Sequence, residues 1–117
     1  MTRVLVFDDD ASIAELFRAV LEDAGFAVTV ATDTHAMPPA TFDCIVSDLM
    51  GQNAYRFEEA RDWILSLQDR FAGVPVVLVT AHHEAERDQT KLGAWRVIMK
   101  PFDVDQVSSA VREAASG

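Results

Sequence analysis

The stretch VLVFDDDAS, residues 4–12, runs from four apolar residues directly into three consecutive aspartates. A short apolar run without alternating polar residues is typical of a strand covered on both faces, as in a parallel sheet. Three carboxylates at the end of such a strand repel one another. The stretch therefore predicts either a site that collects a cation or an acidic turn in contact with water.

Apolar runs of similar length recur along the chain and alternate with segments of helical periodicity. The predicted strands are residues 2–7, 26–31, 43–47, 74–80 and 95–99. The predicted helices are residues 12–25, 34–37, 56–71 and 82–92, with a last one from residue 103. Strand–helix alternation repeated five times predicts an α/β fold, a doubly wound five-stranded parallel sheet between two layers of helices.

The helical segments differ in how much apolar surface they carry. The first has apolar residues at helical spacing: Ile13, Leu16, Phe17, Val20, Leu21 and Ala24. The last has Val104, Val107, Val111 and Ala114. Ser12 and Glu15 have the spacing of a capping box, and Gly25 can end the first helix in a left-handed conformation. Only Ala85 and Leu92 support the helix over 82–92, which predicts weak anchoring.

Size and composition limit the classes of protein to which the chain can belong. A chain of 117 residues, half of them hydrophobic, is sized for a single domain over 1–117 with no effector domain. One cysteine, Cys44, excludes a disulfide framework, and no signal peptide or membrane-spanning stretch is visible. We therefore expect a cytoplasmic protein. A net charge of −9 argues against direct binding of nucleic acid.

Polar residues gather where the predicted strands end. They are Asp8, Asp9 and Asp10 after the first strand, Asp48 after the third, Thr80 and Ala81 at the fourth, and Lys100 with Pro101 after the fifth. Each alone has an ordinary structural explanation as a turn, cap or surface residue. In an open parallel sheet, however, the carboxyl ends of the strands share one edge, where ligands bind.

The chemistry of these residues is mutually consistent. Crowded carboxylates are stabilised by a hard cation, and Mg²⁺ uses a few carboxylates together with phosphate oxygens. A lysine balances phosphate charge, and a threonine hydroxyl with a backbone N–H can bond further phosphoryl oxygens. The set predicts phosphoryl chemistry, with one aspartate as nucleophile.

The ordered set VLVFDDD, CIVSD, VLVTA and GAWRVIMKPF resembles the receiver domain of two-component response regulators over the whole chain. The resemblance implies a flavodoxin-like sheet in the order 2-1-3-4-5. It implies that Asp48 accepts a phosphoryl group from a phosphohistidine on a histidine kinase or histidine phosphotransfer protein. The result would be a phosphorylation-dependent signalling switch that catalyses its own phosphorylation and dephosphorylation, with no turnover of an external substrate.

The same resemblance implies roles for the other residues. Asp8, Asp9, Asp48 and the backbone carbonyl of Met50 would hold Mg²⁺. Thr80, the backbone N–H of Ala81 and Lys100 would bind the phosphoryl group, and the Lys100–Pro101 peptide would be cis. Asp10 is better explained as a cap or turn residue. An effector protein or a second copy would dock on the fourth helix, fifth strand and fifth helix.

The chain departs from the family pattern in two places. The family usually has Met-Pro after the phosphorylated aspartate, where this chain has Gly51 and Gln52. It usually has an aromatic switch residue where this chain has Val97. Trp95 either substitutes for that residue or packs at the end of the fifth strand. His82 and His83 either modulate the site or are exposed loop residues.

Two other functions are compatible with the residues. One is a degenerate receiver, an interaction module without a phosphoryl cycle, which Val97 and the altered loop favour. The other is a small phosphohydrolase resembling the haloacid dehalogenases, with Asp8 as nucleophile and Asp10 completing an Asp-x-Asp motif. This alternative leaves Asp48 without a role. The phosphorylated residue distinguishes it from a receiver.

Overall fold

The computed structural model describes residues 1–33, 40–49 and 54–116. In this part of the chain, five strands form one sheet: β1 (Arg3–Phe7), β2 (Ala27–Ala31), β3 (Cys44–Ser47), β4 (Val76–Thr80) and β5 (Arg96–Met99). The strands are all parallel, and their order is β2-β1-β3-β4-β5. The predicted fold class and strand order are confirmed, and every strand end lies within two residues of its predicted position.

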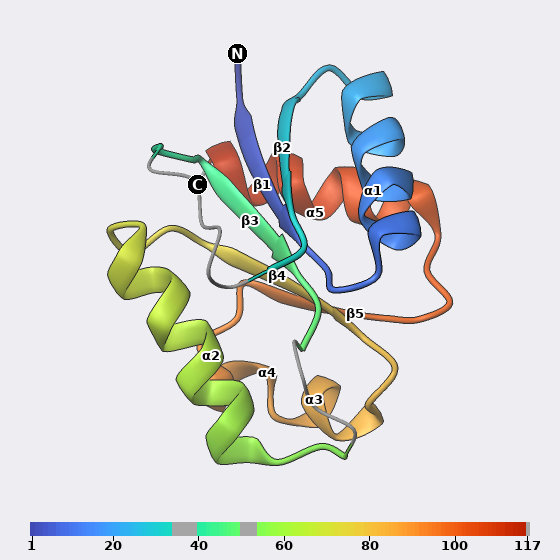
Figure 1. Cartoon of the computed structure of the whole chain (residues 1–117). Coiled ribbons are helices and arrows are strands. Elements are labelled where there is room, and N and C mark those ends of the chain that lie inside the picture. The colour runs from blue at the N-terminus through green and yellow to red at the C-terminus, as the bar shows by residue number, and fades with distance from the viewer. Residues whose placement is uncertain (34–39, 50–53, 117) are drawn as a thin grey trace.

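Helices cover both faces of this sheet (Figure 1). They are α1 (Ala11–Asp23), α2 (Phe57–Arg70), α3 (His83–Arg87), α4 (Gln89–Leu92) and α5 (Val104–Ser116). Helices α1 and α5 lie on one face, and α2, α3 and α4 lie on the other. The short helix predicted over 34–37 falls outside the described residues.

The prediction of one helix over 82–92 is wrong, because the segment forms two short helices separated at Asp88. The carboxylate of Asp88 accepts a hydrogen bond of 2.7 Å from the hydroxyl of Tyr55. The backbone of Asp88, with φ of −93° and ψ of 9°, departs from helical geometry, so this residue ends α3 and precedes α4. The predicted anchors Ala85 and Leu92 are both buried.

The core consists of two apolar clusters, one on each face of the sheet. On the first face, Val4 and Val6 pack with residues of α1 and α5 such as Phe17 and Val111. On the second, Leu5 and Phe7 pack with α2. Successive side chains of a strand point to opposite faces, so a strand covered on both sides must be apolar at every position. This explains the continuous apolar runs in the sequence.

The ends of α1 show which capping prediction holds. Asp10 is the N-cap, because its Oδ1 atom accepts the backbone N–H groups of Ser12 (2.9 Å) and Ile13 (3.3 Å). The capping box predicted for Ser12 and Glu15 is wrong, since the helix begins earlier, at Ala11. The role predicted for Asp10 as a cap is confirmed. Beyond the other end, Gly25 has the expected positive φ of 97°.

Two residues assigned to buried helix faces are in fact exposed. Leu16 is 46% exposed, because it lies about 100° around α1 from the buried Phe17. Val104 is also 46% exposed. It opens α5, and helical side chains lean toward the N-terminus, so it projects past the end of the helix. Among the described residues, no helix is both long enough and apolar enough to cross a membrane.

Candidate functional site

The register of the strands brings the acidic residues together. Phe7, the last residue of β1, pairs with Ser47, the last residue of β3. Asp8 and Asp48 therefore follow a matched pair of strand ends. The backbone N–H of Asp48 extends this alignment by donating to the carbonyl of Phe7 at 2.9 Å.

Asp8 is the most enclosed acid of the group, with 1% of its surface exposed. Its Oδ1 atom accepts the backbone N–H of Asp10 at 2.9 Å, whereas its buried Oδ2 atom has no hydrogen-bond partner among the described residues. Burial raises the pKa of the Asp8 carboxyl above its ordinary value of 3.8. The Asp10 N–H and the Lys100 charge act in the opposite direction, and the charges of Asp48 and Asp9 add to the rise.

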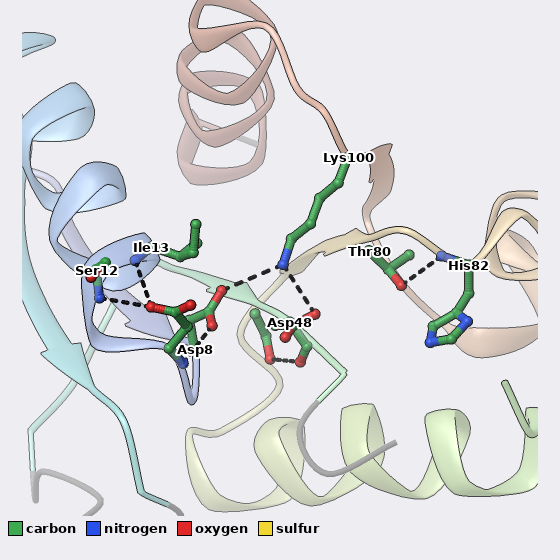
Figure 2. A network of polar contacts seen from close by, with 9 residues as sticks. Asp8, Ser12, Ile13, Asp48, Thr80, His82 and Lys100 are labelled. Atoms are coloured by element: carbon green, nitrogen blue, oxygen red, sulfur yellow. Dashed lines mark hydrogen bonds and ion pairs between the residues drawn. The ribbon is translucent and has the colours of Figure 1, made fainter. Parts of the chain in front are cut away.

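Lys100 reaches into the acidic group from the end of β5. Its Nζ atom lies 3.6 Å from Oδ2 of Asp8 and 3.6 Å from Oδ1 of Asp48, so one cation bridges two carboxylates (Figure 2). The Lys100 side chain is 27% exposed, and that of Asp48 is 21% exposed. Both side chains are therefore partly exposed to solvent.

The donor set at this rim fits a magnesium ion. Asp8, Asp9 and Asp48 each offer a carboxylate oxygen, and these three oxygens lie within 4.8 Å of one another. Mg²⁺ is bound by a few carboxylates and keeps several waters. The Oδ2 atom of Asp8 supports the fit, since this buried oxygen has no hydrogen bond among the described residues and only a 3.6 Å ion pair with Lys100, which leaves it able to bind a metal ion.

The remaining predicted residues are distributed as follows. Thr80 ends β4 with 1% exposure, and its Oγ1 atom accepts the backbone N–H of His82 at 3.1 Å (Figure 2). Ala81 follows it and is exposed. The Lys100–Pro101 peptide is cis, as predicted. Met50 lies outside the described residues, as do Gly51 and Gln52.

The environments of Val97 and Trp95 are now defined. Val97 is buried with 6% exposure, and its backbone N–H donates to Oε1 of Gln89 at 2.9 Å. Trp95 is 42% exposed and sits just before β5, with its backbone N–H bonded to the carbonyl of Val76. Trp95 therefore lies just before the start of β5 and belongs to neither core cluster of the described residues, so both of its predicted roles stay predictions.

Two groups of residues near the site were missed in the sequence. Trp63 of α2 donates its indole N–H to the Ser47 hydroxyl at 2.8 Å. Tyr55 bonds Asp88, and its ring lies 6.2 Å from that of His82, between centroids. No sequence signal could identify either pair, because Tyr55 and Asp88 are separated by 33 positions and meet only in the fold.

The Tyr55–Asp88 bond predicts a local stabilising effect. Tyr55→Phe removes the donor, so amide exchange over residues 83–92 should accelerate about fivefold, the factor for one lost hydrogen bond. Asp88→Asn keeps a carbonyl acceptor and serves as the control. Exchange in Tyr55→Phe at the wild-type rate would show that this bond does not hold the segment.

The difference in amide exchange rate between wild type and Tyr55→Phe should depend on pH, because Asp88 titrates. The hydrogen bond from Tyr55, followed by that from Arg87, lowers the pKa of the Asp88 carboxyl below 3.8. A group whose pKa is lowered by folding stabilises the folded protein fully at pH values above its pKa in the unfolded chain. This stabilisation is lost as the pH falls through its pKa in the folded protein. The difference between wild type and Tyr55→Phe should therefore shrink below about pH 3.8.

Comparison with known proteins decides the family. The model of the response regulator receiver domain matches residues 4–112. The chain is a response regulator receiver domain. Among curated relatives, this receiver domain is 28% identical to the transcriptional regulatory protein FixJ of Bradyrhizobium diazoefficiens, covering 95% of the chain and 57% of that protein. It is 34% identical to the DNA-binding response regulator MtrA of Mycobacterium leprae, covering 94% of the chain and 49% of that protein.

Solved structures agree with this assignment. The receiver domain superposes on the chemotaxis response regulator CheY4 of Vibrio cholerae with a TM-score of 0.73 and 27% identity. The match covers 97% of this chain and 98% of that one. The chain spans about half the length of the first curated relatives that it matches. The activities of those whole proteins are therefore not assigned to this chain.

Proposed function

We propose that this receiver domain accepts a phosphoryl group on Asp48 from a phosphohistidine, with Mg²⁺, and works as a phosphorylation-dependent switch. The observation that carries the proposal is the convergence of three carboxylates and one ammonium at the ends of β1, β3 and β5. Of the three acids, Asp48 combines partial exposure with a direct approach to Lys100, as a nucleophile that meets a large donor requires.

The transfer is a displacement at phosphorus. An oxygen of the Asp48 carboxylate forms a bond to phosphorus while the P–N bond of the phosphohistidine breaks, and the electron pair of that bond stays on the imidazole nitrogen. Lys100 balances the charge of the phosphoryl oxygens from 3.6 Å away from the nucleophile. Mg²⁺, when bound, neutralises the charge that develops on those oxygens.

The other residues of the site would bind Mg²⁺ or the phosphoryl group. Asp8, Asp9 and Asp48 supply side-chain ligands for Mg²⁺, and the Met50 carbonyl is the further ligand that the family resemblance implies. Thr80 donates its hydroxyl to the phosphoryl group, since its Oγ1 atom accepts a bond from His82 and keeps its own proton free to donate. The Ala81 N–H is the second donor that the resemblance implies.

A receiver of this kind has two classes of protein partner. The donor is a histidine kinase or histidine phosphotransfer protein, and the output partner is an effector protein or a second copy. The proposed output surface comprises residues 82–92, β5 and α5. Val97 lies in this region without the aromatic ring usual in the family, so any response there has to pass through other residues.

Intact-mass spectrometry tests the proposal. The protein is incubated with acetyl phosphate with and without Mg²⁺, and the labelled residue is mapped after borohydride reduction of the acyl phosphate. One added phosphoryl mass, dependent on Mg²⁺ and mapped to Asp48, is the expected result. No added mass on folded protein would support the phosphate-independent interaction module that Val97 favours.

A label on Asp8 would instead support the phosphohydrolase. The structure offers little for that function, because Asp10, the second acid of its motif, uses Oδ1 to cap α1. Asp8 itself is almost fully buried and keeps its Oδ1 atom on a backbone N–H. Asp8 is therefore too buried to serve as an exposed nucleophile, and Asp10 is engaged as a helix cap.

A further inference from the structure

The backbone of Asp48 is held from both sides. Its N–H donates to the carbonyl of Phe7 on β1, and its carbonyl accepts the hydroxyl of Ser47 at 2.7 Å. The second bond fixes the peptide plane that joins Asp48 to Leu49, where the chain leaves the strand. Together the two bonds set the direction in which the Asp48 side chain leaves the backbone.

The Ser47 hydroxyl depends in turn on Trp63. Ser47 is completely buried, and its oxygen accepts the indole N–H of Trp63, a residue of α2, at 2.8 Å. An indole nitrogen donates and cannot accept. The hydroxyl proton of Ser47 is therefore directed away from Trp63 and toward the Asp48 carbonyl.

Trp63 also contacts the other acidic strand. Its ring meets the ring of Phe7 edge to face, with centroids 5.5 Å apart and planes at 83°. Phe7 immediately precedes Asp8 and accepts the N–H of Asp48. The contacts form a closed circuit from Trp63 through Ser47, Asp48 and Phe7 and back to Trp63.

We propose that Trp63 is a positioning residue for phosphoryl transfer, acting through Ser47 on the orientation of Asp48. The proposal rests on the proposed function, because it presumes that Asp48 is the phosphoacceptor. Its physical basis is that an in-line displacement tolerates little misplacement of the attacking oxygen. One indole on α2 holds the ends of both acidic strands, so it determines the alignment of the nucleophile with the metal ligands.

The test compares rates of phosphorylation by acetyl phosphate at saturating Mg²⁺. Trp63→Phe keeps an aromatic ring against Phe7 but removes the N–H donor together with part of the ring volume, and Ser47→Ala removes the hydroxyl. Each should slow phosphorylation about tenfold, the lower end of the cost of losing an outer hydrogen-bond partner at a metal site. Trp95→Phe makes the same chemical change away from the circuit and should react at the wild-type rate.

The double variant separates positioning from general loosening. If Trp63 acts through Ser47, Trp63→Phe with Ser47→Ala should be no slower than the slower single variant. Ser47→Thr retains the hydroxyl and should recover the rate. Melting temperatures identify any variant that fails to fold, and in that case the comparison of Ser47→Ala with Ser47→Thr carries the test.

The outcomes distinguish this inference from the function on which it rests. A wild-type protein that takes no phosphoryl group overturns the proposed function and this inference with it. A wild-type protein that is labelled on Asp48 while Trp63→Phe reacts within about twofold of it overturns the inference alone. Multiplying losses in the double variant, or an equal loss in Trp95→Phe, would also overturn it.

Discussion

Asp48→Asn is expected to abolish phosphorylation and, in the absence of Mg²⁺, to make the protein more stable. The Asp48 carboxylate lies near two other carboxylates, and one ammonium at 3.6 Å opposes their repulsion, so we expect the repulsion to prevail when no metal is bound. Removing one of those charges should raise the free energy of unfolding by about 1 kcal/mol, after allowance for screening of a partly exposed group. For a domain of this size the melting temperature should rise by about 4 °C.

Mg²⁺ should act on the two proteins differently. A ligand that binds only the folded state stabilises it by about 2.7 kcal/mol at a hundred times its Kd. Wild type has three carboxylates for the ion and Asp48→Asn has two, so the same Mg²⁺ concentration should raise the wild-type melting temperature more. Thermal melts with EDTA or Mg²⁺, together with intact-mass measurements, give both results.

Asp10→Asn is the matched control for this prediction. It removes a neighbouring carboxylate by the same chemical change, and asparagine caps a helix as well as aspartate does. The control should be labelled and should respond to Mg²⁺ as wild type does. If Asp48→Asn still gains a phosphoryl group, Asp48 is not the phosphoacceptor, and if Mg²⁺ stabilises it as much as wild type, Asp48 is not a metal ligand.

Mg²⁺ should decide whether Asp8→Asn or wild type is the more stable protein. Because burial raises the Asp8 pKa, the folded protein holds this proton more tightly than the unfolded chain does. The stabilisation of the folded protein by this proton is fully present below pH 3.8, the pKa of the carboxyl in the unfolded chain. It is lost as the pH rises through the higher pKa in the folded protein. The amide that replaces the carboxyl does not ionise, so at neutral pH in EDTA the variant should be the more stable protein.

In Mg²⁺ the order should reverse, because wild type then gains binding energy that the variant largely lacks. Unfolding in urea from pH 3 to pH 8, with and without Mg²⁺, measures both effects. In EDTA the two proteins should converge near pH 3.8 and below. Equal stabilisation of Asp8→Asn and wild type by Mg²⁺ would remove Asp8 from the metal site, and a difference independent of pH would contradict the effect of burial.

Much of this molecule can be predicted from short-range patterns. Continuous apolar runs identify the five strands, since only a strand covered on both faces is apolar at every position. The alternation with helices identifies a parallel sheet, and parallel strands place Asp8, Asp48, Thr80 and Lys100 at one edge. The chemistry of the site could therefore be predicted from which residues end the strands.

Errors in the prediction arise where a residue's environment is set by another segment. Leu16 and Val104 have the right spacing for burial, but the neighbouring surfaces leave them exposed. The segment 82–92 has weak helical periodicity, and its division at Asp88 coincides with a hydrogen bond to Tyr55, which is far away in the chain. Periodicity describes one segment at a time and contains no information about such partners.

The sequence by itself determined the fold class, the strand ends and the acidic and basic residues of the site, because each depends on the order of residues within one segment. Only the tertiary structure decided how these residues are held. The register of the strands places Lys100 3.6 Å from the carboxylates of Asp8 and Asp48, and the packing of α2 forms the circuit of contacts through Trp63. Those distances are set when separate segments pack together, and no local pattern specifies them.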